Sequence, residues 1–299
     1  MFQMKIGIIT DTHWGYFSSQ ITRRFRKKER LINAERQMLN EAISWWKEND
    51  IDIIIHLGDT VDSPVVEQTS LAILYFQQLT AAFNKVIVIR GNHDPKPQSQ
   101  YWIALKSIGV DVVTEPKTYG NIGLIPHIPG VDNKQLRKIV KEMASDVEII
   151  GLHYFYDTIG NVVDVKLTDD IKREYPNIQF LFGHIHTTHD DDNVHIVGSF
   201  MRRSFSPAAD LVAIWDGNRL IRHNMSHIRK KMYYFDGEKG LGKHIKKETV
   251  QFKMANKNID VSQQDYLQYG FVPGFKRFLK DIGEDESYAK DLEYFINRL

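Results

Sequence analysis

The sequence predicts an α/β fold built on a largely parallel β-sheet, and three features of the chain carry this prediction. Five near-continuous apolar runs rich in β-branched residues are typical of strands that are buried on both faces. Segments of helical period separate the first three runs, which is typical of βαβ units. Short polar clusters follow several runs directly. Since ligands bind at the carboxyl ends of parallel strands, we expect these clusters to meet in one site.

The expected elements follow in order from the amino terminus. The five apolar runs predict strands at 5–10, 51–57, 86–90, 148–153 and 178–183, with helices at about 29–49 and 66–83. Shorter strands are expected at 194–197 and 211–215, followed by a turn at Asp216-Gly217-Asn218 and a hairpin partner at Leu220 and Ile221. We therefore expect a catalytic domain at 1–215 and a small cap or partner-binding region at 216–299.

Composition limits the chemistry and the location of the protein. The chain has 299 residues, 42% of them hydrophobic, which suits one main core with an appendage. It contains no cysteine, so any metal ion must bind to histidine, carboxylate, amide or water ligands. The formal charge of +1 excludes a polycation, so affinity for a polyanion needs local patches. Without a long apolar run or a signal-peptide pattern, we expect a cytoplasmic protein that does not contact membranes.

Four motifs occur in order after the apolar runs, with a single histidine, His153, before the last. They are Asp11-Thr12-His13, Gly58-Asp59-Thr60-Val61-Asp62, Gly91-Asn92-His93-Asp94 and Gly183-His184-Ile185-His186. A D-x-H pattern alone is expected roughly once by chance in a chain of this size, but a G-N-H-D string directly after a strand is rare. The ordered set is therefore strong evidence for a two-metal phosphoesterase site.

The residue types suit two divalent ions. The spacing of Asp11 and His13, like that of His184 and His186, lets both side chains project from one face if the backbone stays extended. Asp59 has two carboxylate oxygens and is the natural bridge between ions about 3.5–4 Å apart. With Asn92 and His153 as neutral ligands, the site keeps a net positive charge, which would attract a phosphodiester and supply hydroxide for in-line attack on phosphorus.

His93 is the candidate general acid. It follows Asn92 directly and so points elsewhere, which suits a group that protonates the leaving oxygen. Asp94 is placed to counter the effect of nearby cations on the pKa of His93 if the two side chains meet. Asp62 is expected to orient Asp59 or His93 without binding a metal ion itself. The alternative for His93 is a helix-capping or core histidine.

The motif set resembles the calcineurin-like metallophosphoesterase superfamily over about residues 4–186. That resemblance implies a four-layer fold of two mixed sheets between helices and a dinuclear centre, with Mn²⁺ as the first choice and Fe or Mg²⁺ as alternatives. By carry-over, one ion would bind Asp11, His13, Asp59 and His186, and the other Asp59, Asn92, His153 and His184. The segments 11–15 and 198–206 resemble SbcD-type nuclease subunits of double-strand-break repair complexes, which implies a DNA exonuclease or endonuclease that acts in repair, recombination or replication.

Local charge and the same resemblance suggest partners. The cations that we expect to contact a DNA backbone are Arg23, Arg24, Arg26, Arg202 and Arg203, although solvent-facing charge is the alternative. Residues 216–257 are also basic, with four interleaved aromatic residues. The segment Ser70–Phe76 is apolar all round its expected helix, and SbcD-like proteins dimerise in this part of the chain, so we expect a homodimer. The C-terminal helices are a candidate dock for an SbcC-type ABC ATPase, with core packing as the alternative.

Two other functions remain open. The same site could hydrolyse a small nucleotide or another small phosphoester, which a narrow lidded pocket would favour over an open basic groove. A non-catalytic scaffold of the same fold is the third hypothesis. The complete ligand set disfavours it, because a scaffold has no need of seven aligned ligands.

Overall fold

The computed structural model describes residues 5–16, 28–156, 165–201 and 210–228. Its first sheet has six strands in the order β14-β13-β1-β2-β3-β4, in which β1 to β4 are parallel and β13 pairs antiparallel with both β1 and β14. These strands are β1 (Ile6–Ile9), β2 (Ile53–His56), β3 (Lys85–Ile89), β4 (Val110–Val113), β13 (Leu211–Trp215) and β14 (Leu220–Asn224). The carboxyl ends of β1, β2 and β3 therefore meet at one edge.

A second six-stranded sheet has the order β11-β12-β10-β7-β6-β5, with β12, β10, β7 and β6 parallel. Its strands are β5 (Lys117–Tyr119), β6 (Ile122–Ile125), β7 (Ile149–Leu152), β10 (Gln179–Phe182), β11 (His189–Asp191) and β12 (Val194–Ile196). A short parallel pair, β8 (Phe155–Tyr156) with β9 (Lys166–Leu167), follows β7. This sheet brings the carboxyl ends of β7 and β10 together.

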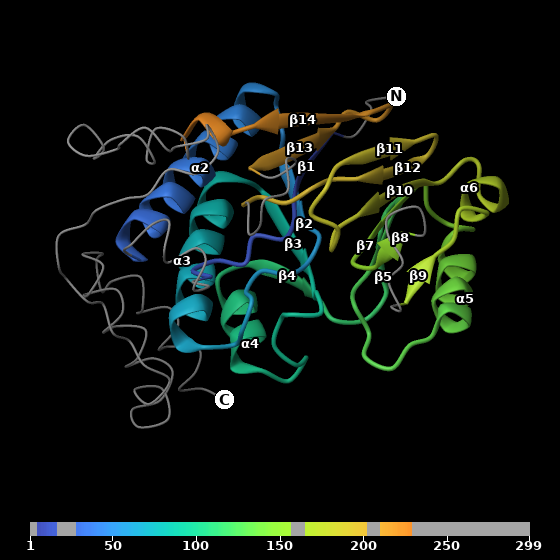
Figure 1. Cartoon of the computed structure of the whole chain (residues 1–299), viewed down its shortest axis with the longest axis horizontal. Helices are drawn as coiled ribbons and strands as arrows, with labels where there is room; N and C mark the ends of the chain where they lie inside the picture. Colours follow the sequence, from blue (N-terminus) through green and yellow to red (C-terminus); the bar gives the residue numbers. More distant parts are fainter. Residues whose placement is uncertain (1–4, 17–27, 157–164, 202–209, 229–299) are drawn as a thin grey trace, which may run out of the picture.

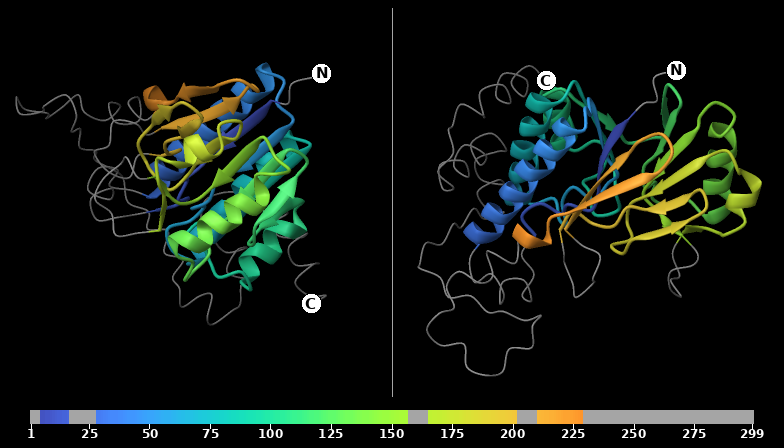
Figure 2. Two further views of the ribbon diagram at one scale, coloured as in Figure 1. Left: turned by 90° about the vertical axis from the view of Figure 1, so that its right-hand side faces the viewer. Right: turned by 90° about the horizontal axis from the view of Figure 1, so that it is seen from above.

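The two sheets are stacked between two sets of helices (Figure 1). The outer face of the first sheet is covered by α2 (Lys28–Glu48), α3 (Val66–Ala82) and α4 (Gln100–Ser107), and that of the second by α5 (Asn133–Met143) and α6 (Ile171–Glu174). The view from above shows the same succession of helix, sheet, sheet and helix (Figure 2). The four-layer fold expected from the sequence is confirmed. Among the described residues, none of the helices combines the length and apolar character needed to cross a bilayer.

Burial on both faces explains why the strands are apolar throughout. In β3, Val86 and Val88 pack in the core beneath the helices, whereas Ile87 and Ile89 pack in the core between the two sheets. Successive side chains of a strand point to opposite faces, so a strand in the middle of four layers has no solvent side. A third core lies between the second sheet and its helices, and it includes Phe180.

The strands and helices expected at the start of the chain are present within one to two residues of the predicted ends. The sequence interpretation assigned no elements to residues 91–147, where the structure has β4, β5, β6, α4 and α5. Because β14 pairs with β13 from Leu220 to Asn224, the first sheet continues past the predicted domain boundary at residue 215. Residues 229–299 lie outside the described part, so the division into two domains stays a prediction.

The apolar surface of α3 has an explanation within a single chain. Every side chain from Ser70 to Phe76 is at most 1% exposed, because α3 packs on β3 and contacts α2 and α4. The uniform apolar character that suggested a dimer interface is therefore what a fully enclosed helix requires. The homodimer stays a prediction, and these residues do not offer it an exposed face.

Candidate metal centre

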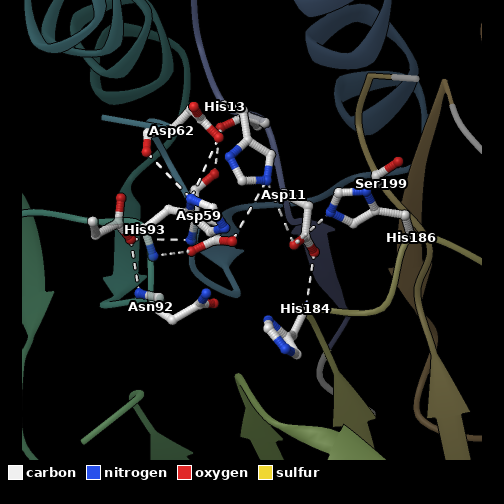
Figure 3. A network of polar contacts seen from close by, with 12 residues as sticks. Asp11, His13, Asp59, Asp62, Asn92, His93, His184, His186 and Ser199 are labelled. Carbon is white, nitrogen blue, oxygen red and sulfur yellow. Dashed lines mark hydrogen bonds and ion pairs between the residues drawn. The ribbon is translucent and has the colours of Figure 1, made fainter. Parts of the chain in front are cut away.

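Seven predicted ligands converge where five strands end. Asp11 and His13 follow β1, Asp59 follows β2, Asn92 follows β3, His153 follows β7, and His184 and His186 follow β10. The potential ligand atoms form two groups, and within each group all of them lie within 4.8 Å of one another. The first group is Asp11, His13 and His186, and the second is Asp59, His153 and His184. Figure 3 shows six of these side chains gathered in one cluster: Asp11, His13, Asp59, Asn92, His184 and His186. The structure therefore brings together the residues that the motifs singled out.

The ligands sit on sharp turns, so the extended backbone on which the argument from the D-x-H and H-x-H spacings depended is not present. Asp11, His13, Asp59 and His184 all have left-handed backbone conformations, with φ between 43° and 74°. Such conformations are strained for residues other than glycine and occur where the surrounding structure fixes them. Here the backbone amides of Asp11 and His13 donate to the carbonyls of Gly58 and Asp59, both at 3.0 Å. The first two ligand loops are thus joined to each other by their backbones.

Close approach of the loops explains two of the motif glycines. A Cβ atom on Gly91 would lie 2.2 Å from Oδ1 of Asp59. A Cβ atom on Gly183 would lie 2.4 Å from the carbonyl oxygen of Leu57 and 2.5 Å from Oγ1 of Thr10. Both distances are far below van der Waals contact, so only glycine allows these loops to pack at this spacing.

The first ligand group is arranged around one oxygen of Asp11. Its Oδ2 accepts hydrogen bonds from Oγ1 of Thr10 at 2.6 Å and from the backbone amide of His184 at 2.9 Å. Its Oδ1 lies 3.3 Å from Nε2 of His186 and 4.0 Å from Nε2 of His13. That oxygen is buried and accepts no hydrogen bond from the described residues. Burial of a carboxylate oxygen without a donor is unfavourable unless a cation completes its surroundings.

The second ligand group is arranged around His153. Its Nδ1 lies 2.7 Å from the carbonyl oxygen of Leu57, which accepts the ring proton and leaves Nε2 facing the other ligands. This Nε2 is 3.0 Å from Oδ1 of Asn92, 3.2 Å from Nδ1 of His184 and 3.3 Å from Oδ1 of Asp59. A carbonyl that fixes the tautomer of a histidine in this way is typical of metal ligands.

Asp59 connects the two groups. Its Oδ1 faces His153 in the second group, and its Oδ2 lies 3.5 Å from Nε2 of His13 in the first. The carboxylate is therefore oriented with one oxygen toward each group, which is the arrangement that a bridging ligand needs.

The electrostatics of the site favour cations. Burial would raise the pKa of Asp11, but contact with His186 and the charge of His153 bring it to about 2. Burial would likewise lower the pKa of His153, whereas Asp59 and Asp11 raise it to about 9. Carboxylates thus stabilise positive charge where the ligand atoms converge. Oδ1 of Asp11 also lacks a hydrogen-bond partner, and the converging ligand atoms are carboxylate oxygens and imidazole nitrogens. These residues therefore fit divalent ions.

His93 and Asp62 lie beside the two groups. The His93 ring is 41% exposed, and its Nδ1 is 3.3 Å from Oδ1 of Asp62, while its backbone amide donates to Oδ1 of Asp59 at 2.9 Å. The Asp62 loop is held from α3, because Oε1 of Gln68 accepts from the amides of Asp62 and Ser63 at 2.9 and 3.0 Å. Asp62 thus contacts His93, one of the two residues that the sequence suggested it would orient.

The expected pairing of Asp94 with His93 is not what the structure shows. The carboxylate of Asp94 is buried and faces the loop that begins at Asp59. Adjacent residues in a tight turn point in different directions, so proximity in sequence did not bring these two side chains together. Asp94 instead accepts hydrogen bonds from the two ligand loops themselves.

Some residues that shape the site carry no motif. His56 is fully buried, which lowers its pKa to about 3 and keeps it neutral. Its Nε2 lies 2.9 Å from Oγ1 of Thr12, the residue between the ligands Asp11 and His13. The Phe155 ring packs edge-on against the ligand His184, with centroids 4.1 Å apart. No local pattern distinguishes these residues, although His56 immediately precedes the second motif. The candidate DNA contacts Arg23, Arg24, Arg26, Arg202 and Arg203 lie outside the described residues.

Residues 4–188 match the protein family described as calcineurin-like phosphoesterase. Among solved structures, the chain aligns with a novel archaeal phosphodiesterase at 16% identity and a TM-score of 0.40, over 74% of this chain and 99% of that one. It aligns with the nuclease MPE of Pseudomonas putida at 15% identity and a TM-score of 0.35, over 73% and 87% of the two chains. A dimetal phosphatase of Danio rerio aligns at 12% identity and a TM-score of 0.48, over 74% and 95%. No curated protein matches the chain in sequence.

Proposed function

The chain belongs to the calcineurin-like phosphoesterase family, and from this membership we propose that it is a metal-dependent DNA nuclease of the SbcD type. Membership makes it a phosphoester hydrolase that uses divalent metals. The observation that carries the proposal is the orientation of Asp59, with one carboxylate oxygen toward each ligand group. Such a bridge suits two ions acting on one phosphodiester.

The proposed ligands follow the two groups. Asp11, His13, Asp59 and His186 would hold one ion, and Asp59, Asn92, His153 and His184 the other. Mn²⁺ is the proposed metal, with Fe or Mg²⁺ as alternatives, because imidazole, carboxylate and amide donors suit ions of this class. When bound, two divalent ions supply Lewis acidity that activates water and offsets charge on the phosphate oxygens.

The protein residues supply proton transfer and orientation. His93 is the proposed acid for the leaving oxygen, since it is exposed beside the ligands and its ring centroid lies 5.2 Å from that of His13. Asp62 holds the ring through Nδ1, so that Nε2 on the opposite side is the nitrogen able to give a proton. Gln68 holds the Asp62 loop in turn.

DNA is the proposed substrate because the segments 11–15 and 198–206 resemble SbcD-type nucleases, and because arginines follow the first segment and lie within the second. A small nucleotide or another small phosphoester is the alternative substrate for the same site. A scaffold without activity is disfavoured because the potential ligand atoms gather in two compact groups. The proposal includes a role in DNA repair or recombination in the cytoplasm. It also includes a homodimer that uses a surface other than Ser70–Phe76, and docking of an SbcC-type ABC ATPase on the C-terminal region.

The test is degradation of end-labelled linear DNA by the purified protein with Mn²⁺. Bis-p-nitrophenyl phosphate is run in parallel, with EDTA and the Asp59→Asn variant as controls. We expect Mn²⁺-dependent cleavage of DNA that both controls abolish. Turnover of the small diester alone would move the substrate to small phosphoesters, or make DNA cleavage conditional on a missing subunit, and failure to bind two equivalents of Mn²⁺ would favour the scaffold.

A further inference from the structure

A buried carboxylate ties together the two loops that carry Asp59 and Asn92. Asp94 is 5% exposed, and its two oxygens accept five hydrogen bonds, four from backbone amides and one from a hydroxyl. The donors are the amides of Asp59 (3.0 Å), Thr60 (2.8 Å), Val61 (3.2 Å) and Gly91 (2.7 Å), and Oγ1 of Thr60 (2.5 Å). All five contacts are donors, so both carboxylate oxygens of Asp94 act only as acceptors.

The same network continues to α4 on the outer face of the first sheet. The hydroxyl of Tyr101 donates a hydrogen bond to Oγ1 of Thr60 at 2.7 Å, and this Oγ1 in turn donates a hydrogen bond to Asp94. Tyr101 is 2% exposed and lies in the first turn of α4, whose N-cap is Ser99. A helix thereby supports a ligand loop through two consecutive hydrogen bonds, each of which polarises the next.

The network acts on Asp59 from two sides. The amide of Asp59 donates to Asp94, while its carboxylate accepts from the amide of His93, so the 91–94 loop holds both ends of this residue. Asp59 has a left-handed φ of 55°, a conformation that is strained for a residue other than glycine and needs support from its surroundings. Backbone amides that converge on the buried carboxylate of Asp94 provide such support.

We infer that Asp94 and Tyr101 are positioning residues that hold Asp59 in its left-handed conformation and fix its spacing from Asn92, and so set the affinity for divalent ions. This inference deepens the proposed function and depends on its metal site, but not on DNA as the substrate. Partners of this kind that orient metal ligands typically change metal affinity about 10-fold to 100-fold when they are removed.

The experiment is Mn²⁺ titration of the full chain by calorimetry without substrate. In Asp94→Asn an NH₂ group replaces one of the two carboxylate oxygens, so at least two hydrogen-bond donors of the ligand loops face another donor. We therefore expect Mn²⁺ affinity to fall about 10-fold to 100-fold. In Tyr101→Phe one hydrogen bond is lost, and affinity should fall about 2-fold to 10-fold. The matched control is Tyr156→Phe, which also removes one tyrosine hydroxyl from a buried residue. That hydroxyl donates to Asp169 and not to the loops that carry Asp59 and Asn92, so we expect Mn²⁺ affinity to stay unchanged.

Two further readouts separate positioning from general destabilisation. Electron paramagnetic resonance of the protein with Mn²⁺ reports exchange coupling between bridged ions, and we expect a changed coupling signal in both variants. Excess Mn²⁺ should restore turnover of bis-p-nitrophenyl phosphate by Asp94→Asn. Wild-type affinity and coupling in a folded Asp94→Asn protein would overturn the inference, and if that variant does not fold, the same result for Tyr101→Phe would do so. A wild-type protein that binds Mn²⁺ but leaves DNA intact would count against DNA as the substrate of the isolated protein and would leave the positioning inference unaffected.

Discussion

Oδ1 of Asp62 lies 3.3 Å from Nδ1 of His93. The His93 side chain is 41% exposed, and this contact fixes the orientation of its imidazole ring. The contact also determines which ring nitrogen points away from Asp62. Carbonyl and carboxylate of Asp62 both face Nδ1, at 3.2 and 3.3 Å. Nε2 is therefore the nitrogen suited to proton transfer, and replacing either residue should affect turnover without emptying the ligand groups.

The first prediction concerns His93→Ala. Loss of a general acid lowers kcat about 100-fold to 10,000-fold, and we expect metal content to stay at two equivalents because His93 lies outside both ligand groups. The loss should be smaller on bis-p-nitrophenyl phosphate than on DNA, since p-nitrophenolate leaves without protonation. The control is His227→Ala, an exposed histidine on Glu41. Full activity of His93→Ala on DNA would refute the acid assignment.

Asp59→Asn is expected to lose both metal ions. One carboxylate oxygen faces each group, so an amide, which is neutral and has a single acceptor, cannot serve both. Asp11→Asn should release one ion only, because Asp11 offers a ligand atom to the first group and not to the second. Metal analysis after dialysis gives the stoichiometry. Mn²⁺ at 100 times its Kd should stabilise the wild type by about 2.7 kcal/mol and leave the melting temperature of Asp59→Asn unchanged. Two retained ions in Asp59→Asn would contradict the bridge.

The ligands could be predicted from the sequence because each motif follows a buried strand. A run such as Lys85–Ile89 predicts a strand enclosed on both faces, and the carboxyl ends of neighbouring parallel strands meet by geometry. The order of the motifs then places Asp59 and Asn92 side by side. Only the backbone was misjudged, because alternation along a strand does not continue into the left-handed turns at Asp11 and His184.

The supporting residues could not be found in this way. Tyr101, Gln68 and Phe155 reach the site only through the packing of α4, α3 and β8 against the sheets, and no spacing in the chain relates them to the ligands. The role considered for Asp94 required its side chain to meet that of His93, whereas the side chain turns inward to the backbone of the neighbouring loop. A local sequence pattern indicates the chemistry available to a residue, whereas tertiary packing determines which residues it contacts.

Gly91→Ala tests the close approach of the ligand loops. The added methyl group would lie 2.2 Å from Oδ1 and 2.3 Å from the amide nitrogen of Asp59, neither of which can move without disturbing the bridge. We expect a loss of stability of about 1–3 kcal/mol from overpacking, together with loss of Mn²⁺ binding. Gly130→Ala is the control: it has a φ of 78° and open space around its Cβ, so it adds backbone strain without contact. Chemical denaturation and calorimetry measure both effects, and wild-type Mn²⁺ affinity in Gly91→Ala would refute the steric argument.

The last prediction concerns the pH dependence of stability and the buried Glu35. Burial raises its pKa from 4.5 to about 8, and the nearby charge of Glu67 acts in the same direction, against hydrogen bonds from the Gly15 amide at 2.9 Å and the Tyr75 hydroxyl at 3.5 Å. Between pH 4.5 and 8 the folded protein therefore keeps a proton that the unfolded chain has lost, so this residue makes stability fall as pH rises through that window.

Glu35→Gln should remove this dependence, because glutamine keeps the acceptor for Gly15 and has no charge to bury. Each pKa unit corresponds to about 1.4 kcal/mol, so the variant should gain up to about 5 kcal/mol over the wild type at pH 9. At pH 5, where Glu35 is protonated in the fold, the two proteins should differ little. Urea unfolding at both pH values measures the difference, with Glu48→Gln on the exposed end of α2 as the control for the same change of charge. An equal gain at both pH values would show that Glu35 is ionised in the folded protein throughout.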